Sequence, residues 1–409
     1  MLIKHLHIEN FKSYKVQDIE LNNFSIIIGS NAAGKSNIID AFRFISNIVE
    51  YGISDAISLS GGWEYLLNNK IKKNKPLVFE FELVPNNTIE KLYEYSKIVY
   101  TFKIKFPKNR NDYNIIEDSL TLVNHITLNN DKNDTVDIPI TYKINQSGTG
   151  KIKEFISKEC KKIIEENSIK VSLEPVINII NNETDKKELI LNKMYFIIMF
   201  RTSVKNFIKI YDFDSKLLKR SSLITTKNEF EEDGSNMAAI LQKILKNKRN
   251  KETLINYLKD CLPFVESVSA KTNNDKSVTY SVTENYTNSM FRANFLSDGT
   301  VNIIAIIIAL YFENNPTVIL EEPERNLHPQ LMSKVIDMAE ESSKKQQIII
   351  TTHTPELIKY ADINSLFLVQ RDKCGFSKII KPANSERVKI FLENEMGIDE
   401  LFSSGLLED

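Results

Sequence analysis

Apolar and polar residues alternate in short runs near the N-terminus, a pattern typical of β-strands. Residues 2–8, 16–21 and 24–28 are predicted to form three strands. A loop containing glycine follows the third strand, and a helix is predicted over residues 35–51. The first part of the chain is therefore expected to be a strand-loop-helix unit.

The C-terminal part, from about residue 290, alternates helices with strands that are apolar almost throughout. Helices are predicted at 300–312, 329–344 and 355–360, and strands at 317–320, 347–351 and 365–369. Strands without a polar face are typical of a parallel sheet covered on both faces by helices. The pattern predicts an α/β fold.

The middle of the chain lacks this regular alternation of helix and strand. Antiparallel strands are predicted at 77–84, 98–106 and 115–127, helices at 151–167, 234–247 and 252–262, and further strands at 264–271 and 277–284. No heptad pattern persists over several turns, so no coiled-coil arm is expected.

We interpret the whole as one α/β head that is split by a large α+β insertion. The head consists of residues 1–69 and 290–409, and the insertion of residues 70–289. The insertion is expected to be β-rich over 70–145, mainly helical over 146–262 and stranded over 263–289.

Composition narrows the class of protein. With 42% hydrophobic and 26% charged residues the chain has the composition of an ordinary globular protein. Its net charge of −1 provides no overall attraction for nucleic acid, so any contact with nucleic acid would need a local basic groove on one face. Cys160, Cys261 and Cys374 are too scattered for a disulfide framework or a zinc site. The N-terminus lacks a signal-peptide pattern, and the apolar runs are too short to span a bilayer. We expect a soluble cytoplasmic protein without membrane contact.

A phosphate-binding loop is predicted between the third strand and the first helix. Gly29-Ser30-Asn31-Ala32-Ala33-Gly34-Lys35-Ser36 matches the pattern GxxxxGK followed by Ser or Thr. Backbone N–H groups of such a loop and the helix N-terminus attract phosphate, Lys35 reaches the terminal phosphates of ATP, and Ser36 can ligate Mg²⁺. Asn37, the next residue, is a further binding candidate.

Two acids end the apolar strand at 317–320. The carboxyl end of a buried parallel strand lies at the sheet edge where ligands bind. Glu321 is predicted to hold Mg²⁺, and Glu322 to orient or deprotonate the attacking water. The alternative is that both acids start a solvated loop.

Leu296-Ser297-Asp298-Gly299-Thr300 precedes a strongly apolar helix. Taken alone, this segment is an Asp-Gly turn with Ser297 as helix N-cap. It resembles, however, the signature of ABC ATPases, which reads LSGGQ in its common form. That resemblance implies that Ser297, Asp298 and Gly299 contact the γ-phosphate of ATP bound to another subunit.

His353 follows the strand at 347–351, one strand after the two acids. A lone histidine is usually structural or exposed. At this position ABC-type ATPases carry a switch histidine, so His353 is predicted to sense the γ-phosphate.

Together these segments resemble the ABC-type AAA ATPases of bacterial defence and genome-maintenance systems, including the ATPase part of overcoming-lysogenisation-defect nucleases. Residues 8–14, 321–324 and 327–329 are similar to that group's head-domain patterns. The resemblance implies an ABC-type P-loop head with a mixed sheet. In SMC-like and Rad-fifty-like relatives the Phe-Lys/Arg-Ser segment lies near the nucleotide, which adds Lys12 and Ser13 as weaker binding candidates.

The chain departs from the family in three places. No Gln lies between Ser36 and Gln146, so the glutamine that many ABC ATPases place at Mg²⁺ and water has no counterpart. Glu321 stands where Asp is commoner. The stretch after Thr354 is too short for the Toprim nuclease domain of fused relatives, so any nuclease is expected to be a separate polypeptide.

The resemblance implies an ATP- and Mg²⁺-dependent ATPase that assembles head to tail as a homo-oligomer. The leading hypothesis is that the chain is the regulatory subunit of an antiphage, abortive-infection system. In this role it controls a separate effector such as a nuclease. The alternatives are an SMC- or RecF-like DNA-binding ATPase in repair and a nucleotide sensor that does not hydrolyse ATP. An ABC transporter subunit is excluded because its signature follows the P-loop far sooner than Ser297 follows Ser36.

Overall fold

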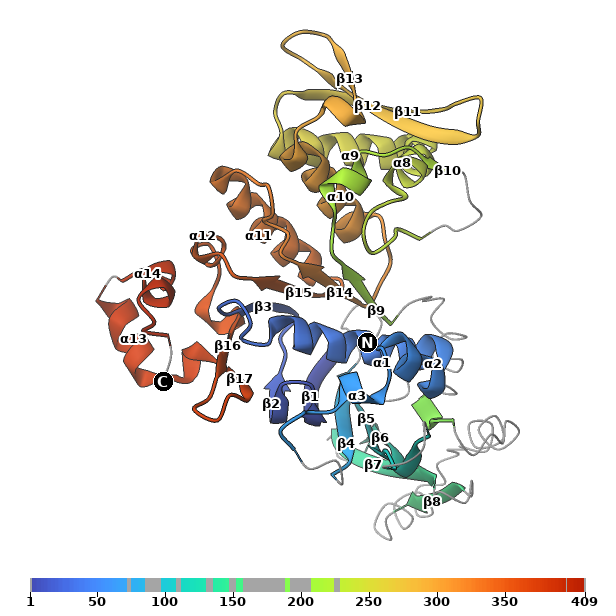
Figure 1. Cartoon of the computed structure of the whole chain (residues 1–409), viewed down its shortest axis with the longest axis vertical. Helices are drawn as coiled ribbons and strands as arrows, with labels where there is room; N and C mark the ends of the chain where they lie inside the picture. The colour runs from blue at the N-terminus through green and yellow to red at the C-terminus, as the bar shows by residue number, and fades with distance from the viewer. Residues whose placement is uncertain are drawn as a thin grey trace. The chain divides into compact units, whose positions relative to one another are not determined.

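The computed structural model describes residues 2–71, 75–84, 97–107, 112–129, 135–146, 152–156, 188–191, 207–223, 229–394 and 396–407. The chain divides into two compact units (Figure 1). The first unit comprises Met1–Asn22, Ser36–Phe207 and Gln370–Ile379. The second unit comprises Asn23–Lys35, Ile208–Val369 and Ile380–Asp409.

The second unit contains a parallel sheet in the order β16-β3-β15-β14-β9. Its strands are β3 (Phe24–Ile28), β9 (Ile208–Tyr211), β14 (Thr317–Glu321), β15 (Gln347–Thr352) and β16 (Leu366–Arg371), the last as far as Val369. Every residue of β3 and β15 is buried, as expected for strands covered on both faces. Because the strands run parallel, their carboxyl ends lie along one edge.

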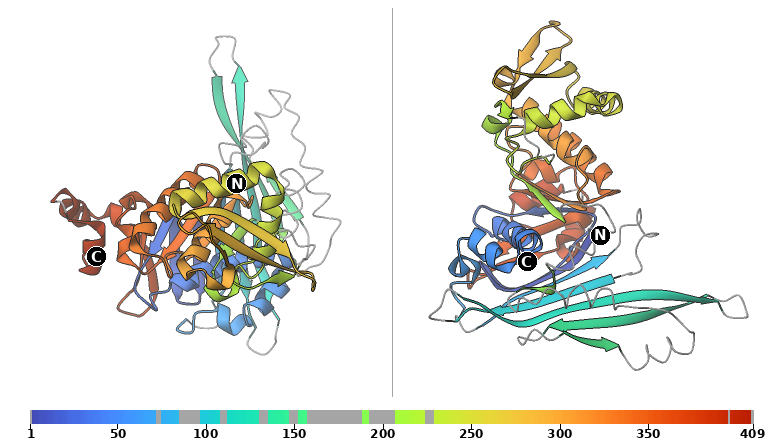
Figure 2. Two further views of the ribbon diagram at one scale, coloured as in Figure 1. Left: turned by 90° about the horizontal axis from the view of Figure 1, so that it is seen from above. Right: turned by 90° about the vertical axis from the view of Figure 1, so that its right-hand side faces the viewer.

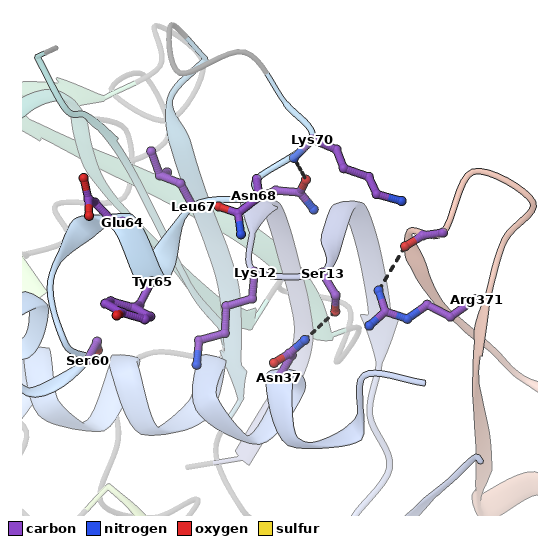
Figure 3. A pocket seen from close by; sticks show the side chains of 12 residues that line it. Lys12, Ser13, Asn37, Ser60, Glu64, Tyr65, Leu67, Asn68, Lys70 and Arg371 are labelled. Atoms are coloured by element: carbon purple, nitrogen blue, oxygen red, sulfur yellow. Dashed lines mark hydrogen bonds between the residues drawn. The ribbon is translucent and has the colours of Figure 1, made fainter. Parts of the chain in front are cut away.

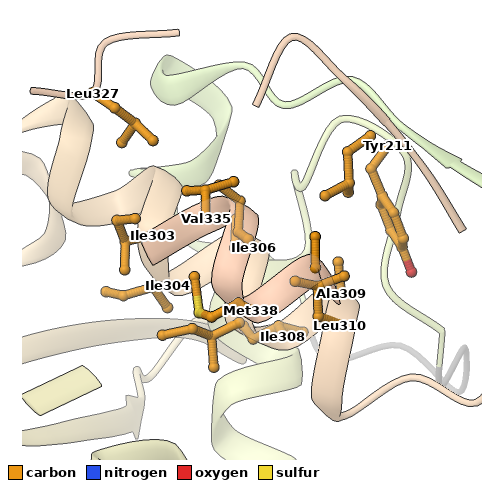
Figure 4. Close-up of a cluster of buried hydrophobic side chains, with 14 of the residues drawn as sticks. Tyr211, Ile303, Ile304, Ile306, Ile308, Ala309, Leu310, Leu327, Val335 and Met338 are labelled. Atoms are coloured by element: carbon orange, nitrogen blue, oxygen red, sulfur yellow. The ribbon is translucent and has the colours of Figure 1, made fainter. Parts of the chain in front are cut away.

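Two helices contribute many residues to the hydrophobic core of this unit. Each residue of α10 (Asp298–Tyr311) from Thr300 to Leu310 is buried, and α11 (Pro329–Ser343) packs against it (Figure 4). A helix that is apolar on all sides must be enclosed by other elements, which explains why the sequence of α10 shows little amphipathic pattern.

A second, antiparallel sheet precedes α10 in the chain. It has the order β10-β12-β11, with β13 paired to β12. The helices α8 and α9 pack along it (Figure 1). The bounds are α7 (Ser215–Leu218), β10 (Ser222–Leu223), α8 (Met237–Lys246), α9 (Lys248–Cys261), β11 (Val265–Thr272), β12 (Ser277–Glu284), β13 (Met290–Arg292) and η2 (Ala293–Phe295).

The second unit ends in short helical elements. They are α12 (Pro355–Ile358), η3 (Ile363–Ser365), η4 (Pro382–Asn384), α13 (Glu386–Glu393) and α14 (Ile398–Ser403). Buried Val388 and Leu401 join α13 and α14 to the hydrophobic core of this unit. No helix in the part of the chain that the structure describes is long and apolar enough to cross a membrane.

The first unit is built on an antiparallel sheet in the order β8-β7-β6-β5-β4-β1-β2, next to which β17 pairs in parallel with β2. The long strands β6 and β7 form a hairpin that extends from the sheet (Figure 2). The bounds are β1 (Leu2–Phe11), β2 (Tyr14–Glu20), β4 (Leu77–Val84), β5 (Lys97–Lys105), β6 (Asn114–Asn129), β7 (Thr135–Gln146), β8 (Ile152–Ile156) and β17 (Ser377–Ile380).

Helix α1 (Lys35–Tyr51) covers this sheet from Ser36 onward, followed by α2 (Ile53–Leu59) and α3 (Trp63–Leu66). Phe44 of α1 lies 5.7 Å from Phe79 of β4 and 6.3 Å from Phe11 of β1, measured between ring centroids. All three rings are buried, so this aromatic cluster joins helix and sheet.

The structure confirms the predicted α/β fold with parallel and antiparallel strands. The helix 35–51 and the strands 24–28, 77–84 and 277–284 have the predicted bounds. One helix prediction was wrong, because residues 152–156 of the expected helix 151–167 form strand β8 on the edge of β7. The rest of that helix, with Cys160, lies outside the described residues. The interpretation of residues 70–289 as an insertion remains a prediction.

We expect Phe44→Ala to lower the free energy of unfolding by about 3–5 kcal/mol, since it removes a buried ring between two others. The measurement is urea unfolding followed by circular dichroism. Tyr65→Ala, at a side chain that is 69% exposed, is the matched control and should change stability little. Equal losses in the two variants would contradict the role of the aromatic cluster.

Candidate nucleotide-binding site

The loop between β3 and α1 has the backbone that a phosphate cradle requires. A Cβ at Gly29 would lie 2.3 Å from the carbonyl oxygen of Val369, so only glycine fits at this position. Ala32 and Gly34 have φ angles of 63° and 122°, which turn the loop back toward the helix start. Ser30, Asn31 and Ala32 are exposed at its tip.

Lys35 is held at the centre of this loop. Its side chain is 8% exposed, and its Nζ donates hydrogen bonds to the carbonyl oxygens of Gly29 at 2.6 Å and Ser30 at 3.1 Å. Burial lowers the pKa of Lys35, while the charges of Glu322 and Glu324 act in the opposite direction. A cation enclosed by a tight loop at a helix start fits a phosphate group.

Glu321 and Glu322 lie at the carboxyl end of β14 and at the start of the following turn. Glu321 is half-buried. Glu322 has a φ of 44°, a left-handed backbone that is unusual for a non-glycine residue, and its N–H donates to the carbonyl of Thr351 at 2.9 Å. Such strain often marks functional positions.

The carboxylate of Glu322 has two charged or titratable partners. His353 Nδ1 lies 3.0 Å from Oε1, and Arg325 Nε donates to Oε2 at 2.9 Å. Arg325 Nη1 donates in turn to Asp212 at the carboxyl end of β9, at 2.5 Å. Burial alone would raise the pKa of Glu322, but the hydrogen bonds from Arg325 and His353 outweigh it and lower the pKa.

Glu324 is the buried acid of this turn. Its side chain is 5% exposed and accepts a hydrogen bond from the hydroxyl of Thr352, the last residue of β15. Burial raises the pKa of Glu324. Glu324 thereby connects the turn after β14 to the end of the neighbouring strand.

The predicted signature segment starts α10. Ser297 is the N-cap, and its exposed hydroxyl accepts a hydrogen bond from the N–H of Thr300 at 3.1 Å. Asp298 forms an ion pair with Lys219. Gly299 packs against the loop after β14, where a Cβ would lie 2.9 Å from the carbonyl oxygen of Asn326.

Lys12, Ser13 and Asn37 come together in the first unit. They line a pocket of about 650 Å³ whose walls also carry the cations Lys70 and Arg371 (Figure 3). Asn37 Nδ2 donates to the hydroxyl of Ser13 at 2.6 Å, and Lys12 forms an ion pair with an acid of α1, Asp40. The pocket can hold a polar or anionic group.

Sequence reasoning missed three residues of the site in the second unit. Arg325 contacts the predicted Glu322, Glu324 contacts the last residue of β15, and Asp212 contacts Arg325. Glu324 lies in the segment 321–324 that resembles the family's head-domain patterns, and that resemblance could have identified it. Asp212 follows a four-residue strand that the apolar pattern did not reveal, and it lies far from Arg325 in sequence.

The predicted Mg²⁺ ligands are Ser36 and Glu321. Ser36 is exposed directly after Lys35 at the start of α1. Within the described ranges, no group of three or more His, Cys, Asp or Glu side chains is arranged to hold a metal. A hydroxyl and a carboxylate are each a type of oxygen ligand that Mg²⁺ accepts.

A family of known proteins and one curated relative match this chain along most of its length, and a second relative matches part of it. The family described as AAA ATPase domain matches residues 1–358. An ATP/GTP phosphatase of Helicobacter pylori is 24% identical over 382 residues, which cover 88% of this chain and 88% of that protein. Septu protein PtuA of Bacillus thuringiensis is 27% identical over 170 residues, which cover 36% of this chain and 43% of that protein.

Solved structures also match. An Smc head bound to the C-winged helix domain of ScpA is 16% identical, with a TM-score of 0.49. The match covers 93% of this chain and 98% of that chain.

We expect Lys35→Ala to abolish ATP binding, because it removes both the cation and the hydrogen bonds to the carbonyls of Gly29 and Ser30. Isothermal titration calorimetry with ATP measures the affinity. Lys359→Ala, at an exposed lysine after α12, is the control and should bind like the wild type. Equal ATP affinity for wild type and Lys35→Ala would refute the prediction.

Proposed function

The chain belongs to the AAA ATPase domain family, and on this basis we propose that it binds ATP at residues 29–36 and hydrolyses it. One observation supports this most. The strands β3, β15 and β14 are parallel neighbours, so the loop around Lys35, His353 and Glu322 all follow carboxyl ends at one sheet edge. An ATP/GTP phosphatase among the relatives agrees with this chemistry.

In the proposed hydrolysis each residue of the site has a separate role. Lys35 turns from the carbonyls of Gly29 and Ser30 to the terminal phosphates, while Ser36 and Glu321 would hold Mg²⁺. Bound Mg²⁺ neutralises phosphate charge. Glu322, kept ionised by its partners, orients the attacking water and accepts its proton. His353, 3.0 Å from Glu322, contacts the γ-phosphate and links its presence to that carboxylate.

The signature segment acts on the ATP of a second subunit. Ser297 is exposed at the start of a helix of 14 residues, which offers a hydroxyl and the positive end of the helix dipole to an anion. Two subunits then associate head to tail, each ATP contacting residues 29–36 of one and 297–299 of the other. Hydrolysis is slow in a monomer, because half of each site is missing.

The biological role we propose is regulation of a separate effector in bacterial defence. It follows from the motif resemblance to ATPases of antiphage systems. ATP-dependent association of two heads changes the surface offered to the effector, which can be a nuclease. Lys12 and Ser13 serve as additional nucleotide contacts in this proposal.

Glu322→Gln is expected to retain ATP binding and to lose most phosphate release, since an amide cannot accept the proton of the attacking water. ATP should therefore accumulate in a stable dimer. Light scattering after gel filtration with ATP measures the mass, and a phosphate assay measures turnover.

The matched control is Lys35→Ala/Glu322→Gln, which should stay monomeric because it binds no ATP. Undiminished phosphate release from Glu322→Gln would rule out the role of Glu322. A monomer at every ATP concentration would rule out the shared site.

The defence role is tested by expressing the chain with its neighbouring genes in bacteria and counting phage plaques. We expect fewer plaques with the wild-type chain, and protection lost with Lys35→Ala because ATP no longer drives association. Equal plaque counts with wild type, Lys35→Ala and empty vector across a phage panel would count against this role while leaving the ATPase activity standing.

A further inference from the structure

In the second unit, the carboxylate of Glu322 is occupied on both of its oxygens. Arg325 Nε donates to Oε2 at 2.9 Å, and His353 Nδ1 lies 3.0 Å from Oε1. A carboxylate that activates water must turn one oxygen to within about 3 Å of it. Each oxygen keeps a second lone pair, but the two contacts fix the orientation of the carboxylate, so Glu322 cannot turn toward a water elsewhere without leaving one of these partners.

Arg325 is the partner that is itself held in place. Its Nη1 donates to Asp212 at 2.5 Å, and its main-chain N–H donates to the carbonyl of Glu322 at 3.1 Å. The planar guanidinium carries donors on several sides, so one arginine can bridge two carboxylates. Asp212 thereby keeps the guanidinium beside Glu322.

The main chain of Arg325 is also attached to the signature helix. Asn302 Nδ2 donates to the carbonyl of Arg325 at 2.6 Å, and Asn302 is only 3% exposed. One turn earlier in α10, Gly299 lies against the carbonyl of Asn326 so closely that a Cβ would not fit. A displacement of the first turn of α10 must therefore move residues 325–326.

An ion pair also connects the chain after α7 to the signature segment. Lys219, at the C-cap of α7, forms an ion pair with Asp298 of the signature segment. The same stretch of chain carries Asp212, the partner of Arg325. Side chains thus join residues 212–219, 297–302 and 322–326 to one another within a single unit.

We propose that Arg325 is a positioning residue that holds Glu322 in an inactive arrangement until the signature segment binds the ATP of a second subunit. The inference rests on the proposed function and adds the regulation of that same site. In this arrangement hydrolysis depends on dimer formation through one defined contact, the hydrogen bond from Asn302 to the carbonyl of Arg325.

Arg325→Met removes the charge and all side-chain donors while keeping much of the side-chain length. We expect ATP turnover at low protein concentration to rise on the order of fivefold, the size of losing one partly exposed ion pair. ATP affinity should stay within about twofold of the wild type, since Arg325 contacts the carboxylate and not the phosphate loop. Arg325→Lys keeps the charge but lacks the planar guanidinium whose donors are fixed toward both carboxylates, so its turnover should be intermediate.

Phosphate release is measured over a wide range of protein concentration, with thermal melting to verify folding. Asn302→Leu removes the donor to the carbonyl of Arg325 and should lose the rise of turnover with protein concentration. Arg249→Met, at an exposed arginine of α9, is the matched control and should keep the wild-type profile. Adding Glu322→Gln to Arg325→Met should abolish the gain.

Three failures can be told apart. Turnover of folded Arg325→Met at or below the wild-type value would overturn the inference and leave the proposed ATPase intact. A wild-type concentration profile in Asn302→Leu would overturn the link to the signature segment. Absence of Lys35-dependent phosphate release from both wild type and Arg325→Met would overturn the proposed function and the inference with it.

Discussion

The parallel pairing of β15 with β3 on one side and β14 on the other is the constraint on which the candidate site depends. Register pairs Thr352 with Ile28 and Thr351 with Glu321. The chain after each strand therefore emerges at the same edge, although β3 lies near the N-terminus and β14 and β15 lie in the C-terminal part of the chain. An antiparallel neighbour would send one of the three segments to the opposite edge.

This arrangement places polar and strained groups next to a dense apolar core. Lys35 and Glu324 are buried, and Glu322 has a left-handed backbone. Each has at least one partner: loop carbonyls for Lys35, the hydroxyl of Thr352 for one oxygen of Glu324 and the carbonyl of Thr351 for the N–H of Glu322. Helix α10, which is buried from Thr300 to Leu310, supplies hydrophobic stabilisation in the same unit.

Much of the fold could be predicted because the strands around the site are apolar runs bounded by clear loops, as at 24–28 and 347–352. The P-loop and the acids after β14 could be predicted because their chemistry needs fixed local spacing. Asp212 and Arg325 could not, since they meet only after β9 joins β14, and nothing in a four-residue strand marks its neighbour. Residues 152–156 were assigned to a helix because a short run of mixed charged and apolar residues fits both periods.

The contacts around Arg325 have a consequence for any symmetric dimer. In the proposed dimer the signature segment would meet the other subunit's ATP and Glu322 would act on its own, while Asn302 joins the signature helix to the carbonyl of Arg325 within one chain. Under two-fold symmetry each ATP is then sensed by one subunit and acted on by the other. Binding of ATP at one site would then change the free energy of ATP binding at the second site by the amount that the Arg325 contact transmits. Cooperative hydrolysis follows without direct contact between the two nucleotides.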